Sequence, residues 1–203
     1  MSNITLRLPF WALLCLSIVA CSTKPPPPVS YDVQPLWQQR LSELEALESW
    51  ELAGRVAIRE GGQSWNAKLR WSQSGDLYDI LITAPFGQGA ARIYGEPGRA
   101  VIEVPNQSPL VASKAEALLY EHLGWTVPVE SLKYWLEGRP DPGAKVVMRW
   151  DEFGRVVHLE QAGWEVEYRR YIEVGALALP RKLELINSSL RVKLIIDNWQ
   201  LDS

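Results

Sequence analysis

Residues 65–72 read Trp-Asn-Ala-Lys-Leu-Arg-Trp-Ser, and this stretch decides the fold. Its apolar positions alternate strictly with polar ones: Trp65, Ala67, Leu69 and Trp71 against Asn66, Lys68, Arg70 and Ser72. Successive side chains of a strand point to opposite faces, so a period of two predicts a strand with one buried and one solvated face.

The same period continues on both sides of this strand. It marks residues 50–59, 77–83, 89–94, 99–104 and 107–111, and it returns at 146–150, 156–161, 164–169, 183–185 and 190–196. Short turns such as 60–63 and 187–189 separate these segments, as in hairpins. We therefore expect about eleven antiparallel strands, six before and five after an interruption at residues 113–137.

Helical spacing occurs in two places. Residues 36–48 carry apolar side chains three and four positions apart, and residues 113–137 contain two shorter segments of the same kind. Ser113, followed by Glu116 three residues later, is a capping-box pattern that predicts the start of the first of these. The second begins after Pro128 and ends at Gly138.

A sheet of eleven strands accumulates twist, so it curls or closes. We predict a mainly β protein with α-helices: a single-domain, unclosed antiparallel half-barrel whose helices form a lid over the inner face. Side chains readily fill a barrel of about eight strands, so a larger sheet favours an apolar cavity. Its candidate wall residues are Trp65, Leu69, Trp71, Ile80 and Ile82. A solid, tryptophan-packed core is the alternative.

The first twenty residues are typical of a signal peptide. The apolar run from Leu8 to Ala20 is too short to span a bilayer, which needs about 20 residues. Ile18-Val19-Ala20-Cys21 follows as a lipobox, which predicts cleavage before Cys21 and lipidation of its thiol; an ordinary secretory signal with an incidental Cys21 is the alternative. More than one acyl chain would give stable anchoring.

Residues 21–35 are predicted to be a tether, and residues 36–203 a single folded domain. Four consecutive prolines, 25–28, favour an extended polyproline helix that holds the domain away from the membrane. A spacer is the simpler interpretation. A proline-rich recognition ligand is the alternative, although no flanking basic anchors accompany the prolines.

Composition excludes several classes of function. The chain carries 21 basic and 24 acidic residues, so a nucleic-acid partner is not expected. His122 and His158 lie in different predicted elements without metal-ligand spacing, so neither a metal nor another cofactor is expected. Asp76 with Asp79, and Glu165 with Glu167, are paired carboxylates, and a solvated face is a simpler interpretation of each pair than an acid–base pair. We do not expect this protein to be an enzyme.

The turn Thr83-Ala84-Pro85-Phe86-Gly87 is unusual. Pro85 and Gly87 are common turn residues, but Phe86 is not. A phenylalanine at a turn either tucks back against the sheet or stands exposed, and an exposed one needs an apolar receiver. For a tethered protein, the membrane or an acyl chain would serve.

Several segments together resemble the LolB family. They are Cys21, Trp50-Glu51-Leu52-Ala53-Gly54-Arg55, Leu69-Arg70-Trp71, Ala84-Pro85-Phe86-Gly87, Leu132-Lys133-Tyr134-Trp135-Leu136-Glu137-Gly138 and Ile196-Asp197-Asn198-Trp199. The resemblance implies an unclosed barrel of about eleven strands whose cavity takes acyl chains. It also implies a receptor that accepts acylated lipoproteins from the periplasmic carrier LolA and inserts them into the outer membrane.

Site residues and partners follow from the same resemblance. Cys21 would anchor the chain at the periplasmic face of the cell outer membrane, and Ser22 is consistent with that membrane. The family's membrane-insertion loop commonly reads Asn-Pro-Leu-Gly. It maps onto Pro85, Phe86 and Gly87, with Ala84 and Phe86 as departures.

The expected partners are a LolA-type carrier, acylated lipoprotein cargo and outer-membrane lipid, bound by a monomer. A lipid or glycolipid carrier on the same half-barrel is the alternative.

Overall fold

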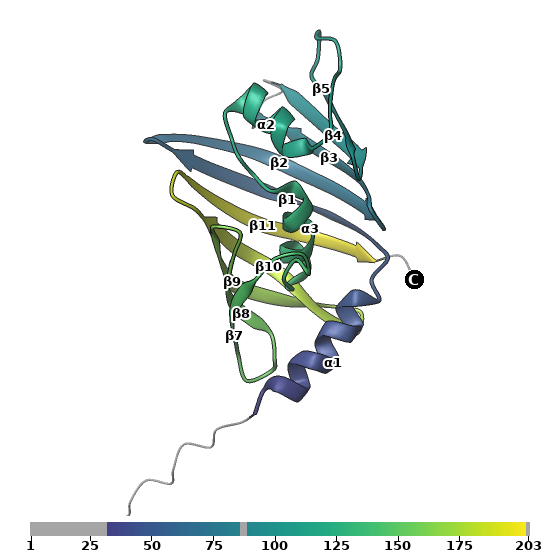
Figure 1. Cartoon of the computed structure of the whole chain (residues 1–203), viewed down its shortest axis with the longest axis vertical. Coiled ribbons are helices and arrows are strands. Elements are labelled where there is room, and N and C mark those ends of the chain that lie inside the picture. The colour runs from purple at the N-terminus through teal and green to yellow at the C-terminus, as the bar shows by residue number, and fades with distance from the viewer. Residues whose placement is uncertain (1–31, 86–88, 202–203) are drawn as a thin grey trace, which may run out of the picture. The chain divides into compact units, whose positions relative to one another are not determined.

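The computed structural model describes residues 32–85 and 89–201. Their strands form one eleven-stranded antiparallel sheet (Figure 1). The strands are β1 (Ser49–Glu60), β2 (Gln63–Ser74), β3 (Leu77–Thr83), β4 (Ala90–Glu96), β5 (Arg99–Glu103), β6 (Leu110–Ala112), β7 (Val146–Trp150), β8 (Val156–Gln161), β9 (Trp164–Val174), β10 (Leu177–Ile186) and β11 (Leu190–Leu201). The predicted number and antiparallel arrangement of strands are confirmed.

The order of the strands explains why the sheet is unclosed. It runs β6-β5-β4-β3-β2-β1-β11-β10-β9-β8-β7, so the first and last strands meet in the middle. Every other pairing joins strands that follow one another in the chain. The two edges, β6 and β7, are connected in sequence by the helical insert and do not pair with each other.

In the described part of the chain, three helices accompany the sheet: α1 (Gln34–Glu45), α2 (Ala115–Leu123) and α3 (Val129–Glu137). In Figure 1, α2 and α3 lie across one face of the sheet, which we call the inner face. α2 packs on β4, β5 and β6, and α3 packs on β10. The predicted helical cover is therefore present.

Two helix starts differ from the prediction. α1 begins at Gln34 rather than at residue 36, because Pro35 is accommodated in its first turn, where no N–H donor is needed. The capping box predicted at Ser113 is wrong. The residue that precedes α2 is Lys114, and no side chain caps that helix.

The core lies between the inner face and the helices and is rich in tryptophan. The Trp50 ring lies 5.9 Å from the Trp71 ring and 5.3 Å from the Trp199 ring, measured between centroids. Tilted and edge-to-face contacts of this kind stabilise a core beyond the area they bury. Strands on both sides of the β1–β11 junction thus contribute to one continuous core.

Among the described residues, no helix combines the length and the apolar character that a membrane crossing requires. The predicted signal peptide, the lipobox with Cys21 and the tether up to residue 31 lie outside the described residues, as do Phe86 and Gly87.

Candidate functional site

The structure brings four of the five predicted cavity residues together. Leu69 of β2 pairs with Ile82 of β3, and Trp71 pairs with Ile80. Trp65 stands further along β2, opposite Ile58 of β1. All five follow the alternation that defines the inner face.

These residues differ in how far they are covered. Leu69, Trp71 and Ile80 are buried, whereas Ile82 is half-buried. Trp65 keeps 38% of its surface exposed. Side chains therefore cover most of the predicted wall in this conformation, and Trp65 marks the point on β2 where the apolar inner face reaches solvent.

A crevice of about 260 Å³ lies beside α3. Trp71, Tyr78 and Val129 line it together with Asp76 and Lys133. Lys133 Nζ lies 2.9 Å from Asp76 Oδ1, so this ion pair ties α3 to the turn between β2 and β3. The crevice is more polar than the apolar cavity predicted from the strand count.

Polar side chains fix α3 to the sheet. Trp50 Nε1 donates to Glu137 Oε1 at 2.9 Å, and Trp135 Nε1 donates to Gln161 Oε1 at 2.9 Å. The Tyr168 hydroxyl donates to the Trp135 carbonyl oxygen at 2.9 Å. Burial raises the pKa of Glu137. Sequence reasoning missed this framework, although Gln161 and Glu137 stand out as polar residues among apolar ones.

By contrast, α2 is attached mainly through apolar side chains. Ala115, Leu118 and Leu119 are buried against the sheet. Immediately after the helix, Trp125 meets Trp65 edge to face, with ring centroids 5.3 Å apart. The Trp65–Trp125 contact joins the segment between α2 and α3 to the exposed end of the inner face.

The predicted membrane loop begins where β3 ends. Thr83 pairs with Ala90 of β4, and Ala84 N donates to Gly89 O at 2.9 Å, which closes the base of the loop. Pro85 is exposed. The structure thus places Pro85 on a short closed loop between two paired strands.

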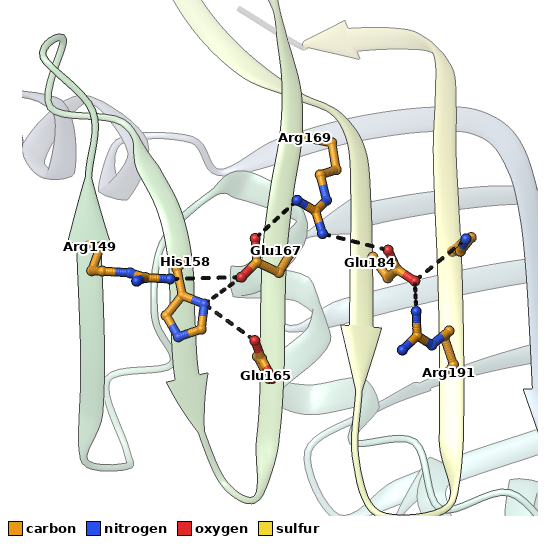
Figure 2. Close-up of polar contacts among 8 residues, drawn as sticks. Arg149, His158, Glu165, Glu167, Arg169, Glu184 and Arg191 are labelled. Atoms are coloured by element: carbon orange, nitrogen blue, oxygen red, sulfur yellow. Dashed lines mark hydrogen bonds and ion pairs between the residues drawn. The ribbon is translucent and has the colours of Figure 1, made fainter.

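The outer face of β7–β11 carries a network of charged side chains (Figure 2). His158 Nδ1 lies 2.8 Å from Glu167 Oε1, and His158 Nε2 lies 2.9 Å from Glu160 Oε1. Arg169 lies between Glu167 and Glu184, at 3.5 Å and 4.0 Å. Glu167 is therefore an ion-paired residue rather than a member of the freely solvated face predicted from sequence.

The pKa of His158 reflects two opposed effects. Burial alone would lower it, but the hydrogen bonds to Glu160 and Glu167 outweigh burial and raise the pKa. The imidazole can therefore carry the positive charge that holds the two carboxylates on either side of it.

His158, Glu165 and Glu167 also place three ligand atoms within 4.8 Å of one another, close enough for a divalent cation. Arg149 and Arg169 lie 3.9 Å and 3.5 Å from Glu167 and already supply positive charge there. Ion pairs alone account for this arrangement.

The other predicted carboxylate pair is separated by the structure. Asp76 binds Lys133, whereas Asp79 accepts hydrogen bonds from Arg92, with Asp79 Oδ1 3.0 Å from Arg92 Nε. Each carboxylate is thus engaged by its own cation.

An unclosed antiparallel sheet with helices across its apolar inner face defines a class of half-barrel proteins, and solved structures share it. A LolA superfamily protein from Nitrosomonas europaea matches with a TM-score of 0.58 at 11% identity, covering 84% of this chain and 94% of that one. A DUF1329 family protein from Desulfovibrio piger matches with a TM-score of 0.54 at 9% identity, covering 84% and 93%.

Comparison with related sequences then identifies the family within this class of half-barrel proteins. The family model described as outer membrane lipoprotein LolB matches residues 48–199. The outer-membrane lipoprotein LolB of Nitrosococcus oceani is 41% identical over 96% of this chain and 98% of its own. That of Pseudomonas syringae pv. syringae is 40% identical over 81% and 80%. The chain belongs to the LolB family, and its place is the outer membrane.

Proposed function

We propose that this protein accepts acylated lipoproteins from a LolA-type periplasmic carrier and inserts them into the outer membrane. Membership of the LolB family over residues 48–199 is the observation that carries the proposal. The half-barrel fold and the apolar inner face support it, because an acyl chain needs apolar side chains around it.

Transfer would be passive. The cargo's acyl chains would move to whichever apolar site binds them more tightly, and a difference of about 1.4 kcal/mol favours one site tenfold. The membrane is the final acceptor, since each buried CH₂ contributes about 0.8 kcal/mol. This mechanism needs neither a catalytic group nor a nucleotide.

We propose that acyl chains enter at the exposed end of the inner face. Trp65 is the exposed member of the predicted wall, whereas Leu69, Trp71 and Ile80 are covered. α2 is the part of the cover that could move aside, because it is held mainly by apolar contacts. The polar bonds described above hold α3 in place. Entry at Trp65 would displace the segment around Trp125 and extend inward along β2.

The membrane-facing part of the proposal concerns Pro85, Phe86 and Gly87. Cys21 would anchor the chain through its lipid, and the segment between Cys21 and α1 would tether the domain within reach of the leaflet. Phe86 would then dip into the membrane and allow the bound acyl chains to leave.

Transfer in solution tests the first step. The chain without residues 1–21 keeps every described residue, so it can be mixed with a LolA-type carrier that holds an acylated lipoprotein, and cargo can be followed by co-purification. Movement of cargo to this protein supports the receptor. If cargo stays on the carrier while a free fatty acid still binds here, the protein is a lipid carrier of the same fold.

Release into membrane tests the second step. Phe86→Glu should leave capture of cargo intact and reduce its transfer to phospholipid vesicles at least tenfold, because a charged residue enters the bilayer at high cost. Phe153→Glu is the matched control, since Phe153 is 62% exposed on the turn between β7 and β8. Loss of capture in Phe86→Glu, or equal loss of release in both variants, would contradict this role.

A further inference from the structure

Two buried polar atoms near α2 have no hydrogen-bond partner among the described residues. They are Nε1 of Trp125 and Nε2 of His122. Trp125 as a whole is only 8% exposed, and its Nε1 is buried from bulk solvent. A buried donor without an acceptor destabilises a fold, and native proteins leave few of them.

Other buried indoles in this chain show what is missing at Trp125. The N–H groups of Trp50, Trp71 and Trp135 donate to Glu137, Gln73 and Gln161, each at 2.9 Å. Trp199 donates to the Pro180 carbonyl oxygen. These four buried indoles thus each have an acceptor, whereas the indole of Trp125 has none.

Trp125 lies at the exposed end of the inner face, beside β2. Its ring contacts that of Trp65, which is 38% exposed on β2. The unsatisfied Trp150 N–H is different, because Trp150 belongs to β7 and contacts Trp37 of α1, in the other half of the sheet. Trp125, by contrast, contacts Trp65 of β2, one of the residues that are candidates for holding acyl chains.

The chemistry of an indole N–H limits what it can bind. It donates a hydrogen bond and cannot accept one. The hydrocarbon part of an acyl chain has no acceptor, whereas the ester and amide groups at its head each carry a carbonyl oxygen. In a site with little water, such a hydrogen bond is stronger than it would be in solvent.

We infer that the Trp125 N–H binds a carbonyl group at the head of one of the cargo's acyl chains. This inference rests on the proposed function and adds a polar subsite to it. Trp65 would pack on the first methylene groups, and the chains would continue toward Leu69 and Trp71. The site would thereby recognise the acylated cysteine rather than hydrocarbon in general.

A pair of matched probes tests the inference. One is a synthetic lipopeptide with an N-palmitoyl, S-diacylglyceryl cysteine. The other has the same chain lengths but ether and alkyl linkages, so it has no carbonyl at the head of a chain. Both are titrated into the chain without residues 1–21 by isothermal calorimetry. The wild-type chain should bind the carbonyl probe about three- to tenfold more tightly, as expected for one hydrogen bond.

Variants at position 125 distinguish the contribution of the N–H donor to binding from that of the aromatic ring. Trp125→Phe should bind both probes with equal affinity. Trp125→benzothienylalanine should do the same while keeping the shape of indole, since sulfur replaces its N–H. Trp65→Phe is the control, and it should weaken both probes without removing the preference between them.

The possible results distinguish the two proposals. If both variants at position 125 keep the wild-type preference for the carbonyl probe, the subsite is overturned and the receptor stands. If the wild-type chain binds neither probe, the proposed function fails and the subsite fails with it.

Discussion

Gly54 shows how a single residue shapes the central pair of strands. The pairing of β1 with β11 shifts register between Ala53 and Gly54. A Cβ atom built at Gly54 would lie 2.3 Å from the Ile195 carbonyl oxygen, well inside the distance at which atoms clash. The backbone of β11 therefore approaches so closely that only glycine fits.

Gly54→Ala should accordingly lower the free energy of unfolding by about 2 kcal/mol, in the range expected for overpacking against rigid backbone. Urea denaturation measures the change. Gly143→Ala is the control, because the nearest atom to its Cβ is the end of the Asp141 side chain at 3.2 Å, which can move. Equal changes in the two variants would show that close approach at Gly54 is unimportant.

The charge of His158 should make the free energy of unfolding depend on pH. Glu160, Glu165 and Glu167 face its ring, and Arg149 lies 3.9 Å from Glu167. Burial would lower the pKa of His158, but the hydrogen bonds to Glu160 and Glu167 outweigh burial and raise it above the ordinary value of 6.5. A raised pKa means that the folded state binds the proton more tightly than the unfolded state does.

The stabilisation from His158 is therefore complete below the unfolded-state pKa and is lost as pH rises through the higher folded-state pKa. The difference in unfolding free energy between the wild type and His158→Asn should be largest near about pH 6 and smaller near about pH 9. Chemical denaturation at both values measures it. A difference that does not change with pH would mean that the imidazole acts only as a neutral hydrogen-bonding group.

At the scale of elements, α3 depends on one buried amide. Gln161 of β8 accepts hydrogen bonds from Trp135 Nε1 and Asp141 N, and its amide nitrogen donates to the carbonyl oxygens of Asp141 and Ala144. All four hydrogen bonds are 2.8–2.9 Å long. This side chain therefore joins α3, the loop that follows it and β8.

Gln161→Leu should destabilise the protein by roughly 3 kcal/mol, because it preserves size but leaves several buried polar groups unpaired. Thermal and urea unfolding check the value, and hydrogen exchange should show the loss concentrated in α3. Gln38→Leu on the exposed side of α1 is the control, for which a change within about 0.5 kcal/mol is expected. A small effect at Gln161 would mean that water replaces its partners.

At the scale of the whole molecule, the C-terminal strand lies in the middle of the sheet. β11 pairs with β1 on one side and with β10 on the other. Leu194 and Ile196 of β11 are buried in the core, as is Trp199. Chain ends are commonly dispensable, but that tolerance depends on the burial and hydrogen bonding of the residues removed.

Removal of residues 190–203 should therefore abolish the fold, because it separates the two halves of the sheet and opens the core between them. Loss of the near-ultraviolet circular dichroism of tryptophan and of a cooperative thermal transition would show it. A chain lacking only residues 202 and 203 keeps all of β11 and should unfold as the full chain does. A folded product from the longer deletion would show that the six N-terminal strands form an independent unit.

The sequence predicts the architecture well because alternation is a local signal. Trp65, Leu69 and Trp71 identify the inner face without knowledge of their partners. The structural roles of Gly54 and Gln161 could not be predicted from a local pattern. The need for glycine comes from β11, about 140 residues away along the chain, and the role of the amide comes from α3.

The candidate site was harder to predict for a related reason. Leu69, Trp71, Ile80 and Ile82 could be assigned to one face from periodicity, but their cover depends on how α2 and α3 pack. Trp125 follows a helix and has no periodic pattern of its own, so only the structure shows its ring against Trp65 and its N–H without an acceptor. Phe86 lies outside the described residues, and its place at the membrane stays a prediction.

The pairing of β1 with β11 also bears on when the protein can fold. Ser49 leaves the ribosome long before Leu201, so the β1–β2 hairpin can form early, while the central ladder must wait for the last strand. Contacts between distant parts of a chain slow folding, since a long loop must close before they form. Until the last strand is made, the two halves of the sheet remain unjoined.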